Sequence, residues 1–183
     1  MRSVVTGVAG VGKTTVLDIV SKKSGFAIVN YGTVMFDVAK ERKLANDRDE
    51  MRKLAPDIQV ELQRLAANKI GSMDNILIDT HMSIKTPRGY LPGLPEWVLR
   101  ELKASLYVII EANPEIIKKR RDNDPTRKRD EDSESDIDEH QRMNRYFAAA
   151  YSIFTGATVL FVKNEEGKPE EAADHILKVL AND

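Results

Sequence analysis

The feature that most constrains this chain is a phosphate-binding motif close to its N-terminus. Residues 7–15 read GVAGVGKTT and match the pattern G-x-x-x-x-G-K-[ST]. Two valines precede the motif and an amphipathic stretch from Thr14 to Lys23 follows it, so the loop lies between a strand and a helix. Its glycines let backbone N–H groups point at phosphate oxygens, and the helix adds its positive end. The motif therefore predicts a nucleotide-binding α/β domain.

Individual residues of this loop have separate expected roles. Lys13 is expected to bridge the β- and γ-phosphates, and the Thr14 hydroxyl is expected to bind Mg²⁺, which is the predicted cofactor. The whole phosphate-binding set is Gly7, Val8, Ala9, Gly10, Val11, Gly12, Lys13, Thr14 and Thr15.

A second element of the same chemistry is an acid at the end of an apolar run. Asp79 directly follows the apolar run Ile76–Ile78. An acid in this position of a P-loop protein orients water bound to Mg²⁺. An aspartate in this position also occurs as a helix cap or a turn residue. Together with the P-loop, the metal role through water is the favoured interpretation of Asp79.

Short apolar runs separated by longer helical stretches indicate the fold class. The runs are nearly all apolar, which is typical of strands covered on both faces, and every gap is long enough for a crossover helix. We expect an α/β three-layer sandwich with a five-stranded parallel sheet. The gap from about residue 31 to 75 exceeds one crossover and predicts an insertion of two or three helices. The runs are residues 4–5, 27–29, 76–78, 107–110 and 159–162.

Composition excludes several classes of function. The 183 residues fit one domain at about 150 residues per domain. Because there is no Cys, disulfides, zinc–thiolate sites, iron–sulfur clusters and thiol nucleophiles are excluded. A net charge of −1 argues against nucleic acid or an anionic membrane as a partner. The apolar runs are far shorter than the roughly twenty residues of a membrane span, and the motif leaves little room for a secretion signal before it. We expect a cytoplasmic protein.

Arginines gather in three parts of the chain. Arg48 and Arg52 lie in the insertion, Arg88 follows the third run, and a charged segment over about residues 120–140 is followed by Arg145. That segment is either a solvated loop or an arginine-bearing lid over an anionic ligand. Arginine binds phosphate bidentately and stabilises charge during phosphoryl transfer. This distribution suits a small kinase with two phosphorylated substrates, and the base-reading N/T-K-x-D motif of a switch GTPase is not found after the last run.

Six longer motifs resemble the archaeal-type adenylate kinase family. They are Asn30–Thr33 (NYGT), Asp47–Leu54 (DRDEMRKL), Asp79–His81 (DTH), Lys85–Pro95 (KTPRGYLPGLP), Thr126–Arg129 (TRKR) and Thr155–Thr158 (TGAT). The resemblance implies the P-loop nucleoside monophosphate kinase fold with strand order 2-3-1-4-5. It also implies Mg²⁺-dependent transfer from ATP to AMP giving two ADP, and a homotrimer. Alternatives are a kinase for other or broader acceptors, or a slow ATPase acting as a regulatory or assembly factor.

The resemblance also implies roles for residues outside the P-loop. Arg52 and Arg88 would bind the AMP phosphate, and Arg48 would either assist or pair with a neighbouring acid. Gly32 and Thr33 would line the acceptor base pocket. The side chains expected to act on the transferring group are those of Lys13, Arg88, Arg127, Arg129 and Arg145. His81 either touches the acceptor or the metal-bound water, or is a structural histidine.

Overall fold

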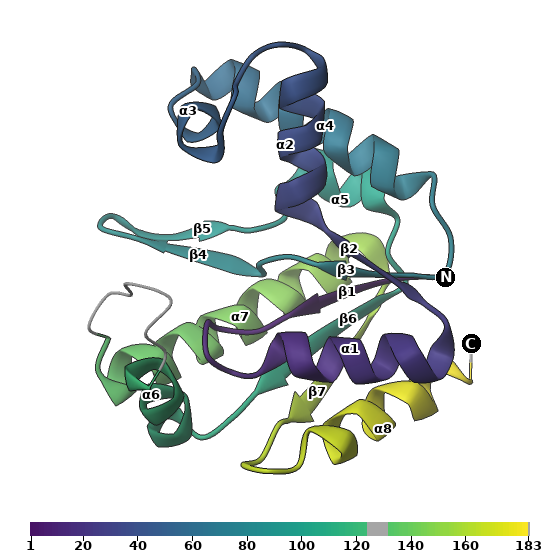
Figure 1. Cartoon of the computed structure of the whole chain (residues 1–183), viewed down its shortest axis with the longest axis vertical. Coiled ribbons are helices and arrows are strands. Elements are labelled where there is room, and N and C mark those ends of the chain that lie inside the picture. The colour runs from purple at the N-terminus through teal and green to yellow at the C-terminus, as the bar shows by residue number, and fades with distance from the viewer. Residues whose placement is uncertain (124–131, 183) are drawn as a thin grey trace.

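A five-stranded parallel sheet forms the centre of the molecule (Figure 1). The structure, a computed structural model, describes residues 1–123 and 132–182. The strands are β1 (Arg2–Thr6), β2 (Ala27–Asn30), β3 (Ile76–Asp79), β6 (Leu106–Glu111) and β7 (Thr158–Lys163). They are arranged as β2-β3-β1-β6-β7, which confirms the order 2-3-1-4-5 for the parallel strands.

Helices cover both faces of this sheet because its buried residues alternate between two apolar cores. Val5 and its neighbours pack against α1 (Lys13–Ser24) and α8 (Pro169–Leu180). Val4 belongs to the opposite core, which includes α5 (Glu96–Leu102) and α7 (Glu134–Thr155). The predicted three-layer sandwich is therefore confirmed.

Three helices separate β2 from β3 and stand above the sheet in Figure 1. They are α2 (Tyr31–Glu41), α3 (Arg48–Arg52) and α4 (Pro56–Gly71). Asn30 caps α2 by accepting from the Thr33 N–H, and Asp47 caps α3 in the same way. A small core of their own holds them together: Val38, Ala39, Ala45, Met51 and Leu62. These helices occupy the range in which an insertion was predicted.

An antiparallel hairpin follows β3 and was not foreseen from the sequence. It consists of β4 (Ser83–Thr86) and β5 (Gly89–Pro92), joined by a turn with Gly89 at φ 116°. In Figure 1 it projects between the helical insertion and the helices α6 (Pro114–Asp122) and α7. A turn signal was present in Thr86–Gly89, but strands of four residues give little periodicity.

The predicted lid, about residues 120–140, is described only at its two ends. Helix α6 ends at Asp122 and α7 begins at Glu134 behind a capping box formed by Ser133 and Asp136. Arg127 and Arg129 lie outside the described residues. Within residues 1–123 and 132–182, no helix is long and apolar enough to cross a membrane.

Candidate functional site

The P-loop is held in a conformation that depends on its glycines. Gly10 and Gly12 have φ of 85° and 89°, and Gly12 is the N-cap of α1. A Cβ at Gly7 would lie 2.8 Å from the carbonyl oxygen of Ile110 on β6. Lys13 is the first residue of α1, and the exposed Thr14 follows it. The loop and the positive end of α1 therefore meet where the motif predicts an anion site.

Donors from distant segments bind the carbonyl groups of this loop. Arg121 Nε donates to the Ala9 carbonyl at 2.7 Å, and Arg120 Nη1 donates to the Val11 carbonyl at 3.0 Å. Asn164 Nδ2 donates to the same Val11 carbonyl at 2.8 Å. A loop that aims N–H groups at an anion leaves carbonyls that need other donors.

Sequence reasoning missed these three residues as site residues. Arg120 and Arg121 stand in a basic run that was read as part of a lid, and Asn164 follows the last strand. The available signal was the pair of adjacent arginines at the end of a helix that begins with Asn113-Pro114.

Lys13 and Asp79 come together because β1 and β3 are neighbours in the sheet. Val5 pairs with Asp79 in register, and the loop after β1 brings Lys13 back over that strand end. Lys13 forms an ion pair with Asp79 and donates to the Thr80 carbonyl at 3.3 Å. Asn30 Nδ2 donates to Asp79 Oδ2 at 3.0 Å. The structure thus joins two residues that the sequence assigned to the same centre.

The donor set at this centre suits a metal ion that arrives with a nucleotide. Thr14 offers an exposed hydroxyl, and Asp79 offers a carboxylate at the adjacent strand end. Among the described residues there is no cluster of three or more His, Cys, Asp and Glu that could hold a metal alone. Mg²⁺ commonly uses one or two protein groups, with water and substrate phosphates completing its shell. The residues therefore fit Mg²⁺, while the metal roles of Thr14 and Asp79 stay predictions.

His81 lies close to the same centre. Loss of hydration and the nearby Lys13 ammonium lower the pKa of the His81 imidazole below its ordinary value of 6.5, against the opposing effect of Asp79. This direction favours the uncharged imidazole, which suits a hydrogen-bonding role better than a role as a fixed cation.

The predicted acceptor residues gather at the N-terminal end of α2. Thr33 Oγ1 accepts from Arg48 Nη2 at 2.8 Å, so among the described residues Arg48 pairs with a hydroxyl and not with an acid. A Cβ at Gly32 would lie 3.8 Å from Arg48 Nη1. Asn30 links this cluster to the phosphate centre, because its Oδ1 accepts from the Thr33 N–H at 2.9 Å while its amide donates to Asp79.

Arg52 and Arg88 stand apart from the P-loop. Arg52 on α3 forms an exposed ion pair with Asp49 at 3.0 Å, and its side chain is 71% exposed. Arg88 is exposed in the turn of the hairpin, nine residues beyond the end of β3 at Asp79. Among the hydrogen bonds and ion pairs of the described residues, none joins either guanidinium to residues 7–15. Their predicted contacts with a phosphate stay predictions.

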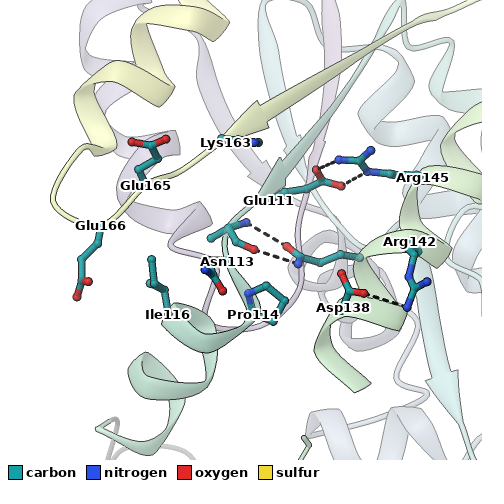
Figure 2. A pocket seen from close by; sticks show the side chains of 12 residues that line it. Glu111, Asn113, Pro114, Ile116, Asp138, Arg142, Arg145, Lys163, Glu165 and Glu166 are labelled. Carbon is teal, nitrogen blue, oxygen red and sulfur yellow. Dashed lines mark hydrogen bonds and ion pairs between the residues drawn. The ribbon is translucent and has the colours of Figure 1, made fainter. Parts of the chain in front are cut away.

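Arg145 lies in a separate pocket of about 760 Å³, seen in Figure 2. It forms a bidentate ion pair with Glu111 at the end of β6 and lies over the Phe161 ring at 4.8 Å. The hydrogen bond to Glu111 raises the pKa of Arg145 further. Among the described residues, those lining this pocket include none from the P-loop. A role of Arg145 at the transferring group, which stays a prediction, would require it to leave Glu111.

Comparisons with known proteins agree with this geometry. Residues 6–138 match a family described as AAA domain. The chain is 69% identical over 180 residues to an adenylate kinase of Thermoplasma volcanium, covering 98% of this chain and 99% of that one. It is 68% identical over 183 residues to an adenylate kinase of Thermoplasma acidophilum, covering all of both chains. A solved shikimate kinase from Acinetobacter baumannii has a TM-score of 0.64 at 15% identity, covering 99% and 93% of the two chains, which shows a shared fold.

Proposed function

Because this chain belongs to the adenylate kinase family, we propose that its P-loop holds ATP and that the N-terminal end of α2 holds AMP. The enzyme is a nucleoside monophosphate kinase that transfers a phosphoryl group from ATP to AMP and gives two ADP. Asn30 is the observation that supports this placement of the two substrates. Its side chain caps α2 and also binds Asp79, the ion-pair partner of Lys13. The two substrates thus meet at the carboxyl ends of β1, β2 and β3.

The reaction needs positioning and charge stabilisation. An oxygen of the AMP phosphate attacks the γ-phosphorus in line, the bond from that phosphorus to the β–γ bridging oxygen breaks, and ADP leaves. The Lys13 ammonium stabilises the negative charge on the β- and γ-phosphate oxygens. The backbone N–H groups of residues 7–12 hold the phosphates of ATP in place. Bound Mg²⁺, held by the Thr14 hydroxyl and by Asp79 through water, would neutralise phosphate charge. Lys13 exchanges its contact with Asp79 for phosphate oxygens when the donor binds.

The arginines divide between the two substrates. Arg52 and Arg88 bind the acceptor phosphate, and Arg48 holds Thr33 beside the acceptor base. Arg127, Arg129 and Arg145 act on the transferring group. Both sets place cations on oxygens whose negative charge is redistributed during transfer.

The assembly we propose is a cytoplasmic homotrimer that binds neither nucleic acid nor membranes. Large apolar side chains that are exposed on α7 and β7 support self-association, since exposed apolar surface is typical of protein interfaces. They are Tyr146, Ile153, Phe154 and Phe161. Sedimentation should give three times the mass of the 20.6 kDa chain, and a monomer at all concentrations would contradict the trimer while leaving the chemistry intact.

An acceptor series tests the reaction directly. The protein is incubated with MgATP and, in turn, AMP, dAMP, CMP, UMP, GMP and shikimate, and ADP is measured. Turnover should require the acceptor and be greatest with AMP; ADP formation without any acceptor would indicate an ATPase instead. A parallel reaction with excess EDTA should lose activity, and added Mg²⁺ should restore it.

A further inference from the structure

A chain of charged side chains connects the P-loop to the hairpin that carries Arg88. We propose that Arg121, Asp132 and Lys85 are positioning residues, which set the location of the acceptor hairpin relative to the donor phosphates. The inference rests on the proposed two-substrate reaction and extends it to residues that contact neither substrate in that scheme.

At the P-loop end, Arg121 packs directly on the backbone of the loop. Its Nε donates to the Ala9 carbonyl at 2.7 Å, and a Cβ at Gly10 would lie 2.9 Å from its Cγ. The Arg121 side chain is only 9% exposed. A buried guanidinium with a fixed planar set of donors holds its partners in one geometry, which a flexible lysine would not do.

Asp132 forms the middle of the chain, since its two carboxylate oxygens bind different partners. Asp132 Oδ2 accepts from Arg121 Nη1 at 2.8 Å, and Oδ1 accepts from Lys85 Nζ at 3.2 Å. Asp132 therefore joins helix α6 to strand β4 through one side chain.

Lys85 is held from a second side by helix α7. Its Nζ donates to Asp136 Oδ1 at 3.0 Å, and Asp136 is itself fixed by the capping box with Ser133. Hydrogen bonds from Ser133 and Lys85 lower the pKa of Asp136 to about 2, so this carboxylate is charged at any pH near neutrality. The ammonium therefore has two charged partners.

The face of the hairpin that carries Lys85 rests on α7. Tyr90, the cross-strand partner of Lys85, has its ring centroid 5.3 Å from that of His140. The Ser83 hydroxyl donates to Asn144 Oδ1 at 2.7 Å. Arg88 lies in the turn only three residues after Lys85, so a shift of Lys85 moves Arg88 with it.

The connection between Arg121, Asp132 and Lys85 would affect the reaction because the rate of phosphoryl transfer depends strongly on the distance between the reacting groups. A displacement of about 1 Å at a reacting group can cost about a hundredfold in rate, even when it originates far from the chemistry. Exposed ion pairs contribute little to stability. Removing the Lys85 contacts should therefore affect transfer more than folding.

Lys85→Met and Asp132→Asn test the proposal through kcat, KM and thermal unfolding. We expect each variant to lower kcat about tenfold, with the KM for ATP changed less than twofold and Tm nearly unchanged. The double variant should lose no more than either single variant, because both remove the same connection. Lys85→Arg should recover most of kcat. Lys23→Met is the matched control, since it removes an ion pair of 2.7 Å between Lys23 in the last turn of α1 and Asp174 on α8.

The outcomes distinguish a failure of the proposed reaction from a failure of this inference. A wild-type chain without AMP-dependent ADP formation would overturn the proposed function and the inference together. An active wild type with unchanged kcat in Lys85→Met, or with equal losses in Lys23→Met, overturns the inference alone. The inference is also overturned if Lys85→Arg loses as much kcat as Lys85→Met does, or if the loss of kcat is accompanied by a fall in Tm.

Discussion

The donor and acceptor sides of this enzyme use the same kinds of cations in opposite surroundings. Arg121 beside the P-loop is 9% exposed, whereas Arg52 on the acceptor side is 71% exposed. Lys13 has partners at the end of β3, Asp79 and the Thr80 carbonyl. The Arg52 guanidinium, among the described residues, pairs with Asp49, three residues away on the same short helix. The side chains around the P-loop are thus organised by the fold itself, whereas the arginines proposed for the acceptor side would gain a phosphate partner only when the substrate binds.

The supporting structure explains this difference. The P-loop extends from β1, whose Val4 and Val5 are fully buried in the two main cores. The acceptor arginines stand on α3, which shares a small core with α2 and α4, and on a two-stranded hairpin. Elements with little buried apolar surface move most easily, and ligand-binding segments are commonly drawn from them.

The largest expected effect on kcat comes from a substitution in the P-loop. Lys13→Ala removes a cation from oxygens that become more negative during transfer, so kcat should fall by roughly a hundredfold or more. Steady-state kinetics with saturating MgATP and AMP measures this. Lys23→Ala, on the last turn of α1, is the control. An unchanged kcat in Lys13→Ala would mean that the loop is not catalytic.

Intermediate effects are expected on the acceptor side. Arg52→Ala or Arg88→Ala removes a charge-assisted phosphate contact worth about 1.5–3 kcal/mol, which corresponds to about ten- to hundredfold weaker AMP binding. ATP binding should hardly change, because no hydrogen bond or ion pair of the described residues joins either side chain to the P-loop. Separate calorimetric titrations with AMP and ATP decide the question.

Arg100→Ala is the control for these two variants, since Arg100 is exposed on α5 and forms a local ion pair with Glu96. If Arg52 serves only Asp49, its removal should cost at most about 1 kcal/mol of stability and leave AMP affinity unchanged. Equal losses for ATP and AMP would contradict the division into two sites.

The smallest effect is a dependence of stability on pH. Loss of hydration lowers the pKa of the partly buried His140 below its ordinary value of 6.5. Below pH 6.5 the unfolded chain therefore binds a proton that the folded chain resists, so the contribution of His140 to stability is complete above pH 6.5 and is lost as pH falls. Denaturant unfolding at pH 7 and pH 5 should show a smaller decrease in His140→Asn than in the wild type.

His175→Asn is the matched control for the pH experiment, because His175 is exposed on α8. It should behave as the wild type does. A wild-type curve that does not fall on acidification, or one that His140→Asn and His175→Asn flatten equally, would contradict the assignment to His140.

Local residue patterns were sufficient for the donor loop and for the class of fold. Residues 7–15 specify an anion-binding loop because the glycines, Lys13 and the start of α1 are contiguous, so the geometry needs few distant contacts. The apolar runs predicted a parallel sheet, while the strand order came from the family resemblance. The hairpin escaped prediction because two strands of four residues show hardly any periodicity.

The sequence by itself determined that the chain is a P-loop α/β protein with Asp79 at the end of a strand. Only the tertiary structure decided which side chains complete that site. Arg120, Arg121 and Asn164 bind the loop from positions more than one hundred residues away, and Arg145 is paired with Glu111 in another pocket. Such contacts depend on how α6 and β7 pack against β1, and no pattern of neighbouring residues encodes that arrangement.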